Sequence, residues 1–402
     1  MAIDLHTGQP VWLLDEKEKF VHQTLKKDLD TEVVVIGGGI AGALISYTLI
    51  NKGMKVVLLD SREIAAGSTS ASTAILSYET DSHLEDLIKE VGKKSALRVF
   101  QAGIEAIDFI EKIVHELDEP CGFKRTDSIY FASTKADGEA IKKEYWLRKE
   151  NGFDVHLLSK EELGSAFSFS APCALLTPNA AEIDPVKFTR ALIRASKKKG
   201  LTVYTNTKIA KYSPHKTTPV GITTEGHIVR AKHFVFATGY ETQEFLHQKS
   251  VKLLSTYAIA SEPVDHLPPS FKRSMFWESK RPYLYIRTTA DDRIIVGGED
   301  VDFKNEKKRD ALLGSKAKIL EKKFRKLFPE VPFKRAATWT GTFAESDDSL
   351  PYIGIHKDFP GAYFSLGYGG NGSTFAAMAC RIISDLIAGE ENSDAEIFSF
   401  ER

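Results

Sequence analysis

"TEVVVIGGGIAGALISYTLINKGMKVVLLD", residues 31–60, is the stretch that decides the fold of this chain. Residues 33–36 are β-branched and apolar, residues 41–50 have a helical pattern, and residues 55–59 are strand-like again. The stretch therefore predicts a strand, a tight turn, a helix and a second strand, which together make one βαβ unit.

Three glycines make the turn of this unit a candidate dinucleotide site. Gly37, Gly39 and Gly42 fit the pattern G-x-G-x-x-G where the strand passes to the helix. The first glycine permits the tight turn, the second lets the backbone approach a pyrophosphate, and the third lets the helix pack closely on the strand. The start of the helix, at Ile40 and Ala41, offers unpaired N–H groups to the phosphates.

The end of the second strand adds an acidic residue to this site. Asp60 can accept hydrogen bonds from ribose hydroxyls, and Ser61 and Arg62 follow it. NAD and FAD both bind such a unit, so the motif alone leaves the cofactor open. Residues 62–81 then continue with small hydroxyl residues and without a new strand–helix repeat, as expected for a loop that hydrogen-bonds a longer cofactor.

Four further stretches follow in a fixed order. They are "GSTSASTA" (67–74), "AAEIDPVKFTRALIRASKKKGLTVYTNTKI" (180–209), "AKHFVFATGY" (231–240), and the pair "TWTGTFAESDDSLPYIG" (338–354) and "GYGGNGST" (367–374). With the glycine motif, they resemble the FAD-dependent oxidoreductase family that includes D-amino acid oxidase, glycine oxidase and sarcosine oxidase. In the first stretch Ala74 stands where the family has a glycine, which we expect to tighten the approach of the backbone to the flavin slightly.

The resemblance implies FAD as the cofactor and an α/β fold. A Rossmann-type FAD-binding domain would be interleaved with an α+β substrate domain that contains an antiparallel sheet. The motif and the resemblance together place these residues at the cofactor: Gly37, Gly39, Ile40, Ala41, Gly42, Asp60, Ser61, Arg62, Gly67, Ser68, Thr69, Ser72, Thr73, Ala74, Leu76, Ile209, Ala237, Thr238, Gly239, Gly341, Gly354, Gly369, Gly370, Asn371, Gly372, Ser373 and Thr374.

A second glycine-rich helix start, "GYGGNGSTFAAMACRIISDLIAG" (367–389), comes near the end of the chain. Reduced flavin gathers negative charge around N1 and the C2 carbonyl. A helix N-terminus with loop N–H groups from residues 369–373 would stabilise that charge. The alternative is a glycine loop that only starts a helix, with Ser373 or Thr374 as the cap.

The pattern also predicts the organisation of the chain. Residues 31–85, 150–250 and 335–402 are expected to form the FAD-binding domain, and residues 86–149 and 251–334 the substrate domain. Helices are expected over 82–117 and 304–328, and antiparallel strands over 251–300. The N-terminal arm, 1–30, lies outside the main resemblance and receives no role.

The substrate face is expected on "PYLYIRTT", residues 282–289. Alternation along a strand puts Tyr283, Tyr285 and Arg287 on one face. Two phenols and a guanidinium could bind a polar or anionic substrate, or form a wet sheet surface. The resemblance places Tyr285 where relatives have a tyrosine near the substrate, and Tyr257 is a weaker candidate on a neighbouring strand.

Departures from the family affect the expected substrate. Amino-acid-oxidising relatives carry arginines where this chain has Phe343 and Gly370. A lysine that assists the reaction with oxygen in sarcosine-type relatives corresponds to Ile295. The usual carboxylate clamp is therefore missing, so either Arg287 replaces it or the substrate is not a simple amino acid.

Composition limits the partners. The 402 residues include 54 Lys and Arg against 55 Asp and Glu, so no strong field favours nucleic acid. No apolar stretch is long enough for a membrane span, which favours a cytoplasmic protein. The three cysteines lack metal-ligand spacing, and no metal is expected. A small molecule is the expected partner, and the oligomeric state stays open.

The expected function is oxidation of a C–N bond in a small amine or amino acid, with hydride transfer to flavin N5 and later hydrolysis of the imine. One alternative is an NAD-dependent dehydrogenase that uses the first βαβ unit alone. The other is a flavoprotein that acts on a macromolecule or within a complex.

Overall fold

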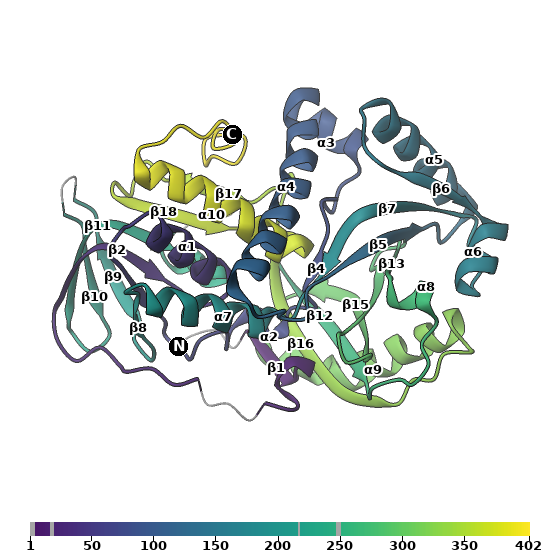
Figure 1. Cartoon of the computed structure of the whole chain (residues 1–402), viewed down its shortest axis with the longest axis horizontal. Helices are drawn as coiled ribbons and strands as arrows, with labels where there is room; N and C mark the ends of the chain where they lie inside the picture. Colours follow the sequence, from purple (N-terminus) through teal and green to yellow (C-terminus); the bar gives the residue numbers. More distant parts are fainter. Residues whose placement is uncertain (1–4, 17–19, 216–217, 247–250) are drawn as a thin grey trace.

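The computed structural model describes residues 5–16, 20–215, 218–246 and 251–402 and contains two sheets (Figure 1). One sheet has eight strands and is parallel at its centre, and the other has ten strands and is largely antiparallel. Helices flank both sheets. The predicted fold class, a Rossmann-type unit interleaved with an α+β part, is confirmed.

The βαβ unit predicted from residues 31–60 is present. It consists of β2 (Leu29–Ile36), α1 (Ile40–Asn51) and β3 (Val56–Leu59), and the two strands pair in parallel. Residues 33–36 of β2 and all of β3 are buried, continuous apolar runs, because parallel strands are covered on both faces. Helix α1 is buried along most of its length, between the sheet and its neighbouring helices.

The eight-stranded sheet brings three glycine turns to one edge. Its central strands run β18, β11, β2, β3, β8, all in parallel. The carboxyl ends of β18, β11 and β2 lie side by side, and each is followed by a glycine-containing turn. In open α/β sheets, ligands bind outside this edge. Besides β2 and β3, the strands of this sheet are β8 (Thr202–Tyr204), β9 (Ile209–Ser213), β10 (Val220–Thr223), β11 (Ile228–Phe236), β17 (Tyr352–Ile355) and β18 (Ala362–Leu366).

The ten-stranded sheet follows the order β1, β16, β12, β15, β14, β13, β5, β7, β4, with β6 paired to β7. The antiparallel strands expected between residues 251 and 300 are its centre. Its members are β1 (His6–Gln9), β4 (Ile75–Leu76), β5 (Lys124–Phe131), β6 (His156–Ser159), β7 (Cys173–Glu182), β12 (Val251–Ser261), β13 (Ser274–Glu278), β14 (Leu284–Thr288), β15 (Ile294–Asp302) and β16 (Arg335–Ser346).

Helices cover the sheets in two groups. Helix α1 packs on α7 (Pro185–Lys198) and α10 (Gly372–Ala388), and these three cover one face of the eight-stranded sheet (Figure 1), while α4 (Lys93–Leu117) packs on α10 and on β7 of the other sheet. Helix α9 packs on β12, β15 and β16 of the other sheet. Besides α1, the helices are α2 (Ser68–Ala71), α3 (Leu84–Val91), α4 (Lys93–Leu117), α5 (Lys135–Glu150), α6 (Lys160–Phe167), α7 (Pro185–Lys198), α8 (Pro269–Lys272), α9 (Glu306–Leu327) and α10 (Gly372–Ala388). The 3₁₀ turns are η1 (Val11–Leu13), η2 (Gly239–Glu244) and η3 (Gly369–Asn371).

The two sheets do not follow the domain boundaries that were predicted from the sequence. Strands β7 and β16 lie in the ten-stranded sheet, although their residues were expected in the FAD-binding domain. Helix α4 packs on α7 and α10, although all of it was expected in the substrate domain. Pairing between distant segments decides which sheet or helix layer an element joins, and no local sequence pattern reveals it. The division into domains therefore remains a proposal.

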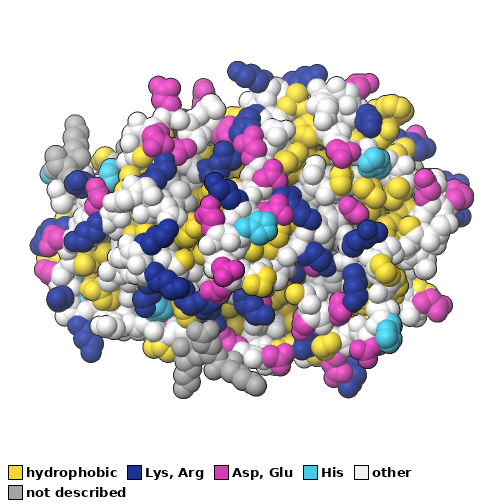
Figure 2. All heavy atoms as spheres, in the orientation of Figure 1, with side chains coloured by type: hydrophobic (Ala, Val, Ile, Leu, Met, Phe, Trp, Pro, Cys, Tyr) yellow, Lys and Arg dark blue, Asp and Glu magenta, His cyan; other side chains and the backbone are white. Residues whose placement is uncertain are grey.

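The surface mixes charges of both signs. In the view of Figure 2, Lys and Arg side chains are interspersed with Asp and Glu side chains over the whole face. Within the described part of the chain, no helix combines the length and the apolar character needed to cross a membrane.

Gly42 provides a direct test of the βαβ packing. A Cβ added there would lie 1.8 Å from the Gly37 carbonyl oxygen, whereas one added to Gly314 in α9 would meet nothing within 4 Å. We expect Gly42→Ala to lower the free energy of unfolding by about 1–3 kcal/mol, as overpacking does. Gly314→Ala is the matched control and should raise it slightly. Denaturant titration of both variants measures the difference, and equal effects would contradict the tight packing.

Candidate functional site

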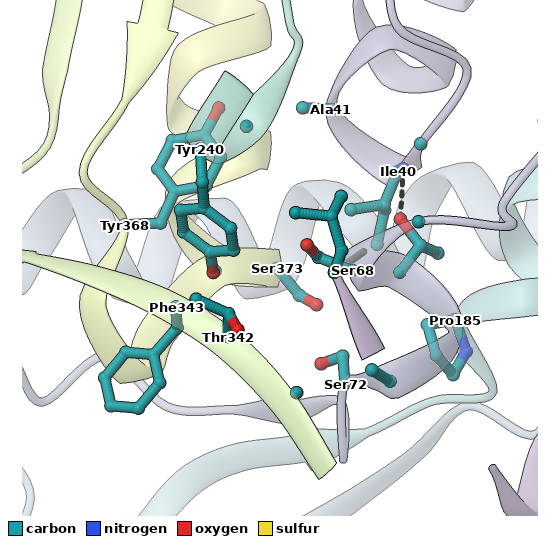
Figure 3. Close-up of a pocket in the computed structure, with 18 of the residues that line it drawn as sticks. Ile40, Ala41, Ser68, Ser72, Pro185, Tyr240, Thr342, Phe343, Tyr368 and Ser373 are labelled. Carbon is teal, nitrogen blue, oxygen red and sulfur yellow. Dashed lines mark hydrogen bonds between the residues drawn. The ribbon is translucent and has the colours of Figure 1, made fainter. Parts of the chain in front are cut away.

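One large pocket lies at the carboxyl edge of the parallel strands and is lined by residues of both sheets (Figure 3). The turns after β2 and β11 and the loop before α10 all contribute to it. The sequence-predicted cofactor residues line this pocket, apart from five: Gly42, Ala74, Leu76, Gly354 and Thr374.

The first helix start meets the pocket with bare backbone. Gly37 has φ +110°, as the tight turn requires, and its N–H donates to the Leu59 carbonyl at 2.8 Å, which ties the turn to the end of β3. Gly39 is the N-cap of α1 and makes no side-chain cap hydrogen bond. The Ile40 N–H donates to Thr69 Oγ1 at 3.0 Å (Figure 3). A Cβ on Gly39 would lie 2.9 Å from the same oxygen, so the site has room for backbone only.

Asp60 is held within the turn as well as at the pocket. Its carboxylate accepts hydrogen bonds from the backbone N–H groups of Gly38 and Arg62, at 2.5 and 2.7 Å. Burial raises its pKa to about 6. Each carboxylate oxygen can accept two hydrogen bonds, so the predicted contact to a ribose hydroxyl remains available. Arg62, also at the pocket, forms a bidentate ion pair with Glu241.

The second helix start opens on the same pocket. Helix α10 has Asn371 as its N-cap, but the Asn371 side chain does not cap the helix, and its Nδ2 instead donates to the Glu79 carbonyl at 2.6 Å. The alternative, capping by Ser373 or Thr374, is therefore not observed. Ser373 points into the pocket opposite Ser68 (Figure 3), while Thr374 Oγ1 is buried without a hydrogen-bond partner among the described residues. One loop N–H is already used, because Gly370 donates to Asp81 Oδ2 at 2.8 Å.

Among the described helices of eight or more residues, α1, α3, α4 and α10 have no side-chain cap, and of these only α1 and α10 begin at the pocket. Four helices, α5, α6, α7 and α9, are capped by side chains of Thr134, Ser159, Asp184 and Asn305. Helices α1 and α10 lack such caps where they face the pocket, and so present positive ends to it. These residues fit FAD, since its diphosphate is anionic and its reduced ring gains negative charge.

Ala74 has a backbone that glycine would favour. It has φ +52°, a left-handed conformation that costs a non-glycine residue of the order of 1 kcal/mol. This is the place where the resembling family has glycine. Ala74 does not line the pocket, so the departure acts through backbone conformation and not through the approach to the flavin that the sequence suggested.

Arg287 lies outside the pocket, which corrects the expectation that it binds substrate. Its side chain is 1% exposed and sits 3.4 Å from the Glu182 carboxylate. The strand alternation is as expected, but the face at Arg287 is covered by the loop after α2 and by Trp12. The guanidinium donates to the carbonyls of Thr73, Ala74, Ile183 and Thr288, at 2.8 to 3.0 Å.

Tyr257 also lies away from the pocket. Its hydroxyl donates to the Arg309 carbonyl in α9 at 3.2 Å, and the side chain is 1% exposed. The preceding residue, Thr256, lines the pocket instead. Because successive side chains of a strand point to opposite faces, Tyr257 is directed into the core under α9. This corrects its place among the substrate residues.

Tyr285 does line the pocket, together with Tyr283. Their ring centroids are 5.6 Å apart, and burial raises the pKa of both phenols, which therefore stay protonated. A Cβ on Gly297 would lie 2.2 Å from the Tyr285 ring, so this glycine leaves the space that the ring fills.

Several pocket residues were not singled out from sequence. Tyr240 and Tyr368 lie beside each other on the side of the pocket away from Ile40 (Figure 3). Each directly follows a glycine of a family-like stretch, 231–240 or 367–374, and this position could have identified both as pocket residues. Trp277 and Asp81 carry no such signal, because only the pairing of β13 with β5 and the course of the loop after β4 bring them there.

Comparison with known proteins agrees with this geometry. The family described as FAD dependent oxidoreductase matches residues 32–386. Gamma-glutamylputrescine oxidoreductase of Escherichia coli (strain K12) is 24% identical over 389 residues, which cover 93% of this chain and 87% of that protein. Glycine oxidase of Geobacillus kaustophilus (strain HTA426) is 21% identical over 379 residues, covering 92% and 97%. The crystal structure of a Geobacillus kaustophilus glycine oxidase has a TM-score of 0.80 at 19% identity, covering 93% of this chain and 99% of that one, and shows the shared fold.

The structural position of Arg287 can be tested against a substrate role. We expect Arg287→Met to lower the free energy of unfolding by about 3–5 kcal/mol, because it removes a buried partner of Glu182 and the donor to several carbonyls. The exposed Arg281 precedes the same strand, and Arg281→Gln should change stability by less than about 0.5 kcal/mol. Denaturant unfolding measures both. A stable Arg287→Met protein that loses only substrate affinity would contradict this role.

Proposed function

Since the chain belongs to the family of FAD-dependent oxidoreductases, we propose that it oxidises the C–N bond of a small amine or amino acid, with amines preferred. The observation that carries the proposal is a single pocket lined by both uncapped helix starts and, beyond the second, by aromatic side chains. Because the family is FAD-dependent, the NAD alternative loses its support.

The residues that would hold FAD are those of the two helix starts and the loops beside them. Residues 39–41 and Thr69 would meet the diphosphate, and residues 372–373 the flavin ring. When bound, FAD supplies the two-electron acceptor for the oxidation, at N5 of its ring. The protein itself must orient the substrate C–H bond, exclude water and accept the reacting nitrogen without its proton, since a protonated nitrogen has no lone pair to donate.

The charges of the pocket favour amines over amino acids. Among the described residues that line it, the cations are Arg62 and Lys208. Each is already paired, Arg62 with Glu241 at 2.7 Å and Lys208 with Glu244 at 2.8 Å, beside Ile209 where the adenine is expected. Neither is available to a substrate carboxylate at the other end.

The opposite end is aromatic and acidic. Trp277, Tyr283, Tyr285 and Phe343 line it together with Asp81. Aromatic faces and a carboxylate attract a substituted ammonium group and disfavour a carboxylate. The Arg281 guanidinium lies 4.6 Å from the centroid of the Tyr283 ring, but Arg281 is exposed, lies outside this lining, and donates to the Asp81 main-chain carbonyl at 2.8 Å.

A substrate with two nitrogens satisfies both demands of this site. One nitrogen would stay charged beside Asp81, and the other would be neutral and undergo oxidation. The products would be an imine, which water hydrolyses, and two reducing equivalents for the cofactor. We therefore place diamines and related amines ahead of amino acids.

Anaerobic mixing tests the reaction. The purified protein should be yellow, and diamines should bleach its flavin absorbance faster than monoamines, amino acids or N-methyl amino acids of similar size. The rate should rise with pH as the reacting nitrogen loses its proton. Absence of bleaching by the whole panel would overturn the amine assignment, and faster bleaching by amino acids would overturn the preference.

The role of Asp81 is tested by binding. Asp81→Asn keeps an oxygen for the Gly370 N–H but removes the charge. It should weaken diamine binding by roughly 10- to 100-fold, since a hydrogen bond to a charged group contributes about 1.5–3 kcal/mol. The dissociation constant is read from the shift of the flavin spectrum. Asp86→Asn, at an exposed aspartate paired with Lys89, is the control and should bind as the parent does. An equal loss in both variants would contradict the role.

A further inference from the structure

We propose that residues 5–16, at the N-terminus, act as a latch that holds the loop of residues 66–74 against the cofactor and slows release of FAD. The segment precedes the part of the chain that matches the family, which begins at residue 32. The proposal rests on FAD being the cofactor and does not depend on which substrate is oxidised.

The latch is anchored to the ten-stranded sheet. Strand β1 pairs antiparallel with β16, with His6 opposite Gly341 and Gly8 opposite Trp339. The Leu5 carbonyl extends this pairing by accepting from the Thr342 N–H at 3.0 Å. Gly8 has φ +89°, and a Cβ there would lie 2.3 Å from the Thr338 carbonyl oxygen, so a side chain would separate the two strands. The segment is therefore seated by backbone contacts at a defined register.

From this anchor, two side chains reach the loop. Trp12 Nε1 donates to the Ser72 carbonyl at 2.7 Å. His6 Nε2 lies 3.0 Å from the Ala66 carbonyl and 3.2 Å from Ser70 Oγ. The latch thus contacts the loop on both sides of the short helix α2, whose residues Ser68 and Thr69 line the pocket.

The Trp12 bond is one member of a series. The carbonyls of four consecutive residues, 71–74, each accept from a side chain that comes from elsewhere in the chain. Trp339 Nε1 donates to the Ala71 carbonyl at 2.8 Å, Trp12 to that of Ser72, and Arg287 to the next two at 2.9 Å. After α2 the local hydrogen bonds of the loop are a long one of 3.4 Å from the Ser72 N–H to the Thr69 carbonyl and one of 3.0 Å from the Ala74 N–H to Ser72 Oγ, and neither uses the carbonyls of residues 71–74. Its conformation therefore depends on these outside donors.

The latch also forms part of the pocket wall. Leu5 lines the pocket and is 6% exposed. A Cβ on Gly67 would lie 3.4 Å from Leu5 Cδ1, so the leucine packs against the glycine that begins the loop. Removing this contact would open the wall next to Ser68 and Thr69. The loop would then be held less firmly, and bound FAD would dissociate faster.

Release of FAD tests the latch without any substrate. The Trp12→Phe holoprotein keeps an aromatic ring but loses the donor to Ser72, and it should release FAD about tenfold faster after dilution, a change within the range of one ordinary hydrogen bond. The rise of free-flavin fluorescence gives the rate. Trp146→Phe, at a tryptophan of α5 that is 59% exposed, is the matched control and should release FAD at the parent rate.

Two further measurements separate a latch from a general loss of stability. Leu5→Ala leaves every hydrogen bond of the loop in place and should also speed release, by opening the wall. The thermal unfolding of each apoprotein is recorded alongside. Faster release from Trp12→Phe or Leu5→Ala, beyond what Trp146→Phe shows and with apoprotein unfolding within a few degrees of the parent, supports the latch. Release at the parent rate from both variants overturns it, as does acceleration only in proportion to a lowered unfolding temperature.

Discussion

The structure depends on two helix N-termini that open onto the same pocket without side-chain caps. Helices α1 and α10 follow β2 and β18, which flank β11 in one parallel sheet, so their positive ends come together at one edge. An uncapped helix start leaves N–H groups that need an acceptor. An extended anionic cofactor provides acceptors for both ends at once, which explains why the chain places glycines at both turns.

The loop of residues 66–74 presents a second constraint, because side chains from elsewhere in the chain hydrogen-bond to its carbonyls. Ala74 adopts a left-handed conformation, and the carbonyls around it accept from Trp12, Trp339 and Arg287. The only arginine on the expected substrate face is thereby committed to the backbone of the cofactor loop. The pocket is left with aromatic rings and Asp81 at its far end, and the proposed preference for a cationic substrate rests on these side chains.

Local patterns predicted the elements of the fold and much of the candidate site. The G-x-G-x-x-G turn, the helix from residue 372 and the antiparallel strands around Tyr285 all depend on spacing along a single element, which sequence displays directly. The predictions for Arg287 and Tyr257 were wrong for a different reason. Alternation tells which residues share a face of a strand, but not which part of that face a distant loop or helix will cover.

The sequence by itself determined the βαβ unit, the glycine turns and the resemblance to FAD-dependent oxidoreductases, because each is a matter of residue type at short spacing. Only the tertiary structure decided that the two helix starts share one pocket, that Arg287 is buried beneath a loop, and that residues 5–16 close the wall beside Gly67. These features arise from strand order and from hydrogen bonds between residues more than fifty positions apart, such as Trp12 and Ser72. No local periodicity records them, since their energy comes from packing between elements.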